Sequence, residues 1–95
     1  MKFFIKSQMH EDKTWTKDVH GYNEFYFKQI EQLPTVVSGP GHVYCRYFIK
    51  DLANLLSSLS VQQKPDMQFI RLVAEIVSFI VQFEDDEIFS VGFMG

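Results

Sequence analysis

The strongest pattern of hydrophobic and polar residues lies between Met67 and Phe83. Polar residues recur there every three or four positions, and the residues between them are almost all apolar. The polar residues are Gln68, Arg71, Glu75, Ser78 and Gln82. This spacing is typical of a helix with one narrow polar stripe and does not fit the two-residue period of a strand. With Pro65 at its start, we predict a helix over residues 65–83 that needs neighbours around most of its circumference.

A second helix is predicted over residues 41–59, where polar residues recur about once per turn and the opposite side is apolar. The sequence Ser38-Gly39-Pro40-Gly41 precedes it and is typical of a break followed by a helix start. The two helices would form an antiparallel hairpin. Residues 23–33 favour a weaker helix with Asn23 as its N-cap. The aromatic residues 25–27 leave a strand open as the alternative there.

Strands are predicted at both ends of the chain. In the segment Lys2–Met9, Phe3, Ile5 and Met9 would share one face of a strand. In Ile88–Met94, apolar residues alternate with serine and glycine, and this closing strand could pair with the opening one.

The remaining segments carry weaker signals. We interpret residues 10–21 as a loop held by Trp15 and residues 35–37 as an extended linker. The predicted fold class is therefore small α+β, formed by an N-terminal strand, a weak helix, a helical hairpin and a C-terminal strand. An all-α fold is the alternative.

Length and composition limit the classes of protein. Ninety-five residues allow one domain, spanning 1–95, and 46% hydrophobic with 22% charged residues is too apolar for disorder. A net charge of −3 argues against a general nucleic-acid binder. A single cysteine cannot form an internal disulfide. Because no apolar segment is long enough for a signal peptide or a membrane span, we expect a cytoplasmic protein with no membrane partner.

Charge is unevenly distributed along the chain. No lysine or arginine follows Arg71, whereas the C-terminal part contains five acidic residues. They are Glu75, Glu84, Asp85, Asp86 and Glu87. We predict that these residues form a partner-binding site, because such a patch attracts a basic partner over a distance. The alternative is a solvated turn that keeps two apolar segments soluble.

Few residues suggest catalysis or metal binding. His42 and Cys45 are three positions apart on the predicted helix and could act as a pair or bind a shared ligand. A metal would need two more ligands, for which only His10 and His20 are histidine candidates. Glu84–Glu87 lacks the alternating ligands and the glycine of a calcium loop. We therefore expect no catalytic residues, no metal and no cofactor.

These features favour a non-enzymatic protein that binds another protein. The most specific expectation is an immunity protein or antitoxin that neutralises a basic toxin, such as a nuclease, by occlusion; a phage-type inhibitor belongs to the same class. The alternative is a homo-oligomer, for example a homodimer, or a subunit of a larger assembly held by the apolar helix. A small enzyme or metal protein that uses His42 and Cys45 is the third hypothesis.

Overall fold

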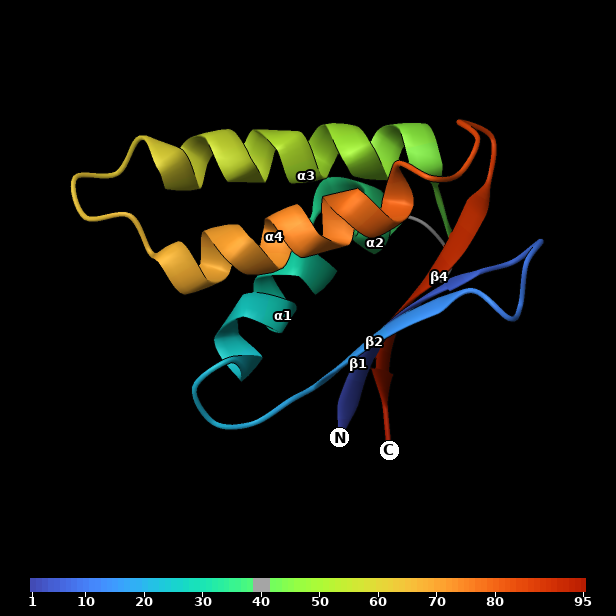
Figure 1. Cartoon of the computed structure of the whole chain (residues 1–95), viewed down its shortest axis with the longest axis horizontal. Coiled ribbons are helices and arrows are strands. Elements are labelled where there is room, and N and C mark those ends of the chain that lie inside the picture. The colour runs from blue at the N-terminus through green and yellow to red at the C-terminus, as the bar shows by residue number, and fades with distance from the viewer. Residues whose placement is uncertain (39–41) are drawn as a thin grey trace.

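The computed structural model describes residues 1–38 and 42–95 and has an α+β fold (Figure 1). The elements follow one another as β1 (Lys2–Ser7), β2 (Thr14–Asp18), α1 (Glu24–Glu31), α2 (Pro34–Ser38), β3 (His42–Tyr44), α3 (Cys45–Ser60), α4 (Met67–Ile80) and β4 (Ile88–Met94). The strands form one antiparallel sheet, and the helices lie together on one side of it (Figure 1). The predicted α+β class is thus confirmed, and the all-α alternative is wrong.

The sheet has the strand order β2-β1-β4-β3, so the first and last strands of the chain are its central pair. Lys2 is paired with Met94, and Ser7 is paired with Phe89. The two termini consequently lie side by side (Figure 1). This pairing confirms the prediction that the closing strand pairs with the opening one.

The opening strand buries every second residue against the helices. Phe3, Ile5 and Ser7 have no exposed surface, as expected for successive positions on one face of a strand. Met9 was predicted to share this face, but the strand ends before it and its side chain is 70% exposed. The chain turns at this point, where the Ser7 N–H donates to the Lys13 carbonyl (3.2 Å).

The loop predicted over residues 10–21 is wrong over Thr14–Asp18, which forms β2. This strand is at the edge of the sheet, and only Trp15 among its five residues is half-buried. An exposed edge strand gains its stability from backbone pairing and does not need alternating apolar residues. Its sequence therefore lacks the hydrophobic period that would have revealed it.

The extended linker predicted over residues 35–37 is also wrong, because Pro34–Ser38 forms the short helix α2. Both the backbone N–H and the hydroxyl of Thr35 donate to Asp51 Oδ2, at 2.9 and 2.7 Å. Asp51 belongs to α3, so a residue distant in sequence satisfies a donor at the start of α2. No local pattern could show this contact.

The helix predicted over residues 41–59 begins later than expected. Residues 42–44 form β3, and α3 extends from Cys45 to Ser60. Val43 pairs with Phe89 of β4 and is buried, so pairing and burial together favour the strand over a helical turn. The predicted break at Ser38–Gly41 reaches residues 39–41, which lie outside the described part of the chain.

The weak helix predicted over 23–33 is present as α1, over Glu24–Glu31. Asn23 occupies the predicted N-cap position, but its side chain does not bond to the helix. Instead, Asn23 Oδ1 accepts from the His20 N–H (2.8 Å), and Asn23 Nδ2 donates to the Asp18 carbonyl (3.0 Å). This asparagine therefore holds the turn that connects β2 to α1.

The helix predicted over residues 65–83 is confirmed as α4, which extends from Met67 to Ile80. Its core side consists of Phe69, Leu72, Val73, Ile76 and Ile80. The opposite side is not fully covered, since Met67 is 51% exposed and Val81, just after the helix, is 57% exposed. Within the described chain, the expectation that neighbours cover most of the helix is therefore met only in part.

Asp66 caps the start of α4 and connects it to α1. Asp66 Oδ1 accepts from the Phe69 N–H (3.2 Å), as expected for an N-cap aspartate. Asp66 Oδ2 accepts from the Tyr26 hydroxyl (2.7 Å). The hydrogen bond from Tyr26 is the main reason that the pKa of Asp66 is lowered, and the same bond raises the pKa of Tyr26.

We expect Tyr26→Phe to raise the pKa of Asp66 toward its ordinary value of 3.8. Because the folded-state pKa is below that value, the ionised carboxylate stabilises the fold above pH 3.8. That contribution is lost as the pH falls through the lowered pKa. The variant should therefore lose less stability on acidification, measured as urea midpoints with NMR titration of Asp66. Tyr22→Phe, at an exposed residue, should change neither quantity, and an unchanged Asp66 pKa in Tyr26→Phe would contradict the prediction.

Candidate protein-binding site

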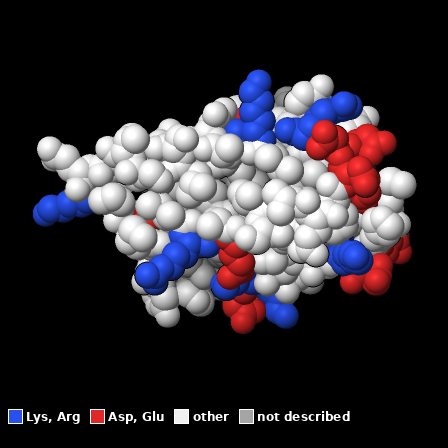
Figure 2. Space-filling model, turned by 45° about the horizontal axis from the view of Figure 1, so that its top comes forward, with Lys and Arg blue, Asp and Glu red and all other residues white. Residues whose placement is uncertain are grey.

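Three of the predicted partner-binding residues lie on one exposed turn. Glu84, Asp85 and Asp86 connect α4 to β4, and all three are exposed. None of them forms a salt bridge with another described residue. Figure 2 shows several acidic side chains at one end of the molecule, with Lys or Arg side chains beside them. We call Glu84–Asp86 the acidic turn.

Glu87 does not belong to this exposed set, and its prediction as a surface residue is wrong. Its side chain is only 3% exposed and accepts a hydrogen bond from the buried Ser7 hydroxyl. Ser7 Oγ in turn accepts from the His10 N–H (2.9 Å). Glu87 therefore connects β1 to the segment before β4 and has a structural role.

The backbone of the acidic turn caps α3. The Arg46 N–H donates to the Asp85 carbonyl (3.2 Å), and the Cys45 N–H donates to the Glu87 carbonyl (2.8 Å). The N-cap residue itself, Tyr44, provides no side-chain hydrogen bond. The carboxylates thus lie near the positive end of the α3 dipole, which stabilises negative charge. These bonds fix the turn in position before any partner binds.

Two exposed tyrosines lie beside the acidic turn. Tyr44 is 44% exposed and Tyr47 is 50% exposed, and their ring centroids are 6.2 Å apart at nearly perpendicular planes. The guanidinium of Arg46 lies 5.5 Å from the Tyr44 ring and 5.2 Å from the Tyr47 ring. Tyrosine and arginine often dominate the energy of protein interfaces. Exposed aromatic rings therefore lie on the segment that contacts the acidic turn, where the Arg46 N–H donates to the Asp85 carbonyl.

The sequence interpretation missed Tyr44 because it began the helix too early, and it missed Tyr47 because it assigned this residue to the apolar side of the helix. With the helix starting at Cys45, its buried side contains Cys45, Phe48 and Leu52. Tyr47 then lies about 200° around the axis from Cys45 and is turned away from the core. The spacing of Phe48, Leu52 and Leu59 gives the same result wherever the helix begins, so the sequence did contain this signal.

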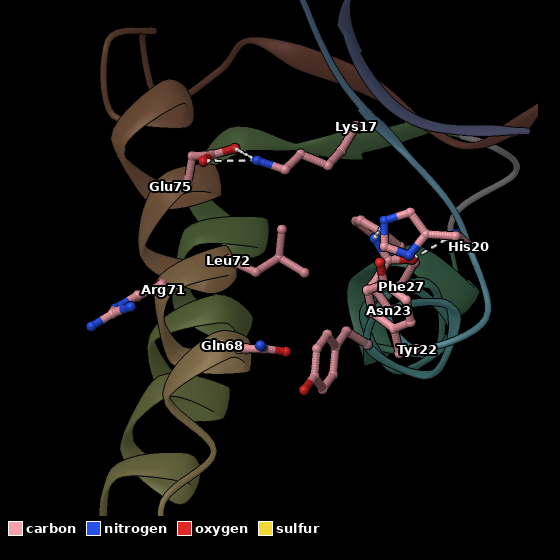
Figure 3. Close-up of a pocket in the computed structure, with 10 residues that line it drawn as sticks. Lys17, His20, Tyr22, Asn23, Phe27, Gln68, Arg71, Leu72 and Glu75 are labelled. Carbon is pink, nitrogen blue, oxygen red and sulfur yellow. Dashed lines mark hydrogen bonds and ion pairs between the residues drawn. The ribbon is translucent and has the colours of Figure 1, made fainter.

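Glu75, the fifth predicted residue, lies elsewhere and does not extend the acidic turn. It projects from the middle of α4 toward β2, where Lys17 Nζ is 3.2 Å from Glu75 Oε1 (Figure 3). The indole N–H of Trp15 donates to Glu75 Oε2 (3.0 Å). Since its charge is already paired, Glu75 contributes to the packing of α4 against the sheet edge.

His42 and Cys45 do not form the pair that a shared helix predicted. His42 belongs to β3 and is exposed, with its Nδ1 3.2 Å from Gln8 Nε2 and 3.4 Å from Ser90 Oγ. Cys45 is fully buried, and its thiol donates to the Ile80 carbonyl (3.6 Å). The two side chains thus have separate environments, because His42 lies on the exposed face of β3 whereas Cys45 lies on the buried side of α3.

The Cys45 thiol is expected to be unreactive in the folded protein. Burial, followed by the charges of Asp85 and Glu87, raises its pKa to about 11. Because the thiolate is the reactive form, Ellman's reagent at pH 8 should react at least about tenfold more slowly than with the protein in urea. Cys45→Ala provides the blank. Equal rates in the folded and unfolded protein would contradict the prediction.

The described residues provide no other indication of a metal or membrane site. In residues 1–38 and 42–95, no group of three or more His, Cys, Asp or Glu side chains is arranged to hold a metal ion. None of the helices within these residues has both the length and the apolar character needed to cross a bilayer.

Comparison with known proteins does not assign a function. No protein-family model, no curated protein and no solved structure matches this chain. Function is therefore inferred from the geometry and charge of the described residues.

Proposed function

We propose that this protein binds a basic protein and neutralises it by covering its surface, as an immunity protein or antitoxin neutralises a toxin. The observation behind this proposal is the acidic turn, with its three unpaired carboxylates beside the exposed rings of Tyr44 and Tyr47. Basic side chains suit the carboxylates, which pair with them, and the exposed tyrosine rings beside Arg46 add aromatic contact area. A protein of this kind needs no catalytic group.

The fixed position of the acidic turn favours binding. Its backbone is held by the first N–H groups of α3, so little conformational freedom is lost when a partner docks. Carboxylates in a fixed arrangement can occupy the positions that phosphates take on a nuclease, which accounts for occlusion of a nucleic-acid-binding surface. A nuclease is therefore the most specific class of toxin that we propose.

The proposal is tested by co-expression with the basic proteins encoded beside this gene. We expect one of them to inhibit growth when it is expressed alone. When this protein is co-expressed, the cells should grow normally, and the two proteins should be purified together as a complex. A variant with Glu84→Gln, Asp85→Asn and Asp86→Asn should lose protection and bind at least about tenfold more weakly. Neutral substitutions are chosen because lysines would oppose the α3 dipole.

The matched control removes the same number of charges from another region. Asp18→Asn, Glu24→Gln and Glu31→Gln change residues around α1 and should leave protection intact. Tyr47→Ala should weaken the complex further, because it removes an exposed aromatic ring from the same surface. The proposal fails if no basic neighbour binds, or if both triple variants protect as well as the wild-type protein.

A second candidate function is supported by the incompletely covered side of α4. Met67, Ala74 and Val81 are exposed there, and Ile70 and Val77 are half-buried, with alternating spacings of three and four residues. This spacing is typical of a helix that packs against another helix. A homo-oligomer or a subunit of a larger assembly would use this side, and Ala74→Lys should then dissociate an oligomer seen by light scattering.

A further inference from the structure

A cleft of about 350 Å³ lies between α4 and the region where β2 leads into α1 (Figure 3). It is separate from the acidic turn, which follows the other end of α4. Its volume is within the range of small-molecule sites, which begin at about 300 Å³. No sequence motif indicated it, because its residues come from three separate segments.

One wall of the cleft is formed by α4. Gln68, Leu72 and Glu75 are four and three residues apart and therefore lie on one face of the helix. Figure 3 shows Gln68 and Leu72 directed into the cleft, whereas Arg71 points away from it. Leu72 is nearly buried, so this wall has an apolar centre between two polar ends.

The opposite wall is formed by α1 and the turn before it. Phe27 is fully buried, and Tyr26 stacks on Phe69 with a centroid distance of 4.5 Å. His20 and Asn23 lie at the edge of this wall (Figure 3). Because Phe27 has no accessible surface, the half-buried Tyr26 is the aromatic side chain of this wall that a flat apolar body could contact, opposite Leu72.

Hydrogen bonds hold the two walls at a fixed separation. The Lys17–Glu75 ion pair connects them at one end, and the Tyr26–Asp66 hydrogen bond connects them at the other. The turn is fixed by the Asn23 side chain, which bonds to the backbone on both sides of it. The cleft is therefore formed in advance, which reduces the cost of binding.

The hydrogen-bonding groups left over in the cleft are mostly donors. Lys17 Nζ donates to both carboxylate oxygens of Glu75 and retains a third N–H. Asn23 Nδ2 can only donate and lies 3.3 Å from His20 Nε2, so we assign the ring proton to Nδ1. Glu75 accepts from both Trp15 and Lys17, so the charges of Glu75 and Lys17 partly compensate each other, and Lys17 offers a ligand its third N–H.

We propose that this cleft binds a small carboxylate with a flat apolar body about the size of one aromatic ring. The carboxylate would accept hydrogen bonds from Lys17 and His20, and the ring would lie between Leu72 and Tyr26. The amide of Gln68 lies at the open side and can accept from or donate to a polar substituent. This site is independent of the partner-binding function proposed above.

Benzoate is the probe that tests this proposal, with binding followed by two-dimensional amide NMR. We expect the amide chemical shifts of Lys17, His20, Gln68 and Leu72 to change and to reach saturation as benzoate is added. The Kd should be on the order of 1 mM for so small a molecule. Benzamide and benzylamine should bind at least about tenfold more weakly, because they lack the negative charge. Shifts that do not saturate, or equal binding of benzylamine, would overturn the proposal.

Two test variants, each with a matched control, locate the site. Gln68→Trp places a bulky ring in the cleft from an exposed position and should abolish the shifts. Gln82→Trp, at another exposed glutamine near the end of α4, should leave them unchanged. Lys17→Gln should remove the preference for benzoate over benzamide, and Lys13→Gln should retain it. Binding that is unchanged in Gln68→Trp, with a native amide spectrum, would place the ligand elsewhere and overturn the proposal.

Discussion

Replacing Phe89 by alanine is expected to lower the free energy of unfolding by about 3–5 kcal/mol. Phe89 is fully buried on the central strand β4, and its ring centroid lies 5.1 Å from Phe83 and 6.3 Å from Phe79. Truncation would leave a cavity and remove two aromatic contacts at the junction of the sheet with α4. For a domain with about 5–15 kcal/mol of stability, this is a large fraction of the total.

Urea unfolding followed by circular dichroism measures this loss. Met94→Ala changes the same strand at a side chain that is 48% exposed, and it should cost less than about 1 kcal/mol. If Phe89→Ala does not fold, Phe89→Leu retains most of the apolar volume and should show a smaller loss of the same sign. A cost for Phe89→Ala no larger than that for Met94→Ala would contradict the described core.

Replacing Ser7 by alanine is expected to destabilise the protein by about 2–3 kcal/mol, which is large for the loss of one hydroxyl. The Ser7 hydroxyl donates to Glu87, and both residues are buried. Without this donor, the carboxylate remains away from water with a hydrogen bond missing. The loss of stability in Ser7→Ala therefore arises more from the buried Glu87 carboxylate that has lost its donor than from the energy of the hydrogen bond itself.

Glu87→Gln tests this explanation, because glutamine retains an acceptor oxygen and removes the charge. In the Glu87→Gln background, Ser7→Ala should cost about 1 kcal/mol less than in the wild-type protein, a coupling that a double-mutant cycle measures. Ser57→Ala, at an exposed position of α3, should have little effect. Additive effects of Ser7→Ala and Glu87→Gln would show that the two side chains do not interact.

The Ser7–Glu87 contact also influences how the candidate protein-binding site is formed. The Glu87 carbonyl accepts from the first N–H of α3, and its side chain is held by β1. The acidic turn before it is thereby fixed to the sheet and to α3 together. Weakening this contact should therefore loosen the acidic turn, although no residue of the turn has been changed.

The sequence by itself determined the elements whose residues are close together along the chain. The spacing of apolar residues in Met67–Ile80 was sufficient for α4, and the alternation in Lys2–Ser7 and Ile88–Met94 was sufficient for the two central strands. These patterns exist because a buried helix side or strand face repeats at a fixed interval. The α+β class and the pairing of the terminal strands followed from them.

Only the tertiary structure decided the contacts between distant segments. A run of four acidic residues looks uniform in the sequence, but Glu87 is buried beside Ser7 while its three neighbours face the solvent. Likewise, β2 depends on pairing with β1, α2 on Asp51, and the cleft on three separate segments. Each of these features depends on groups that only chain folding brings together. The spacing of residues within one segment cannot predict such contacts.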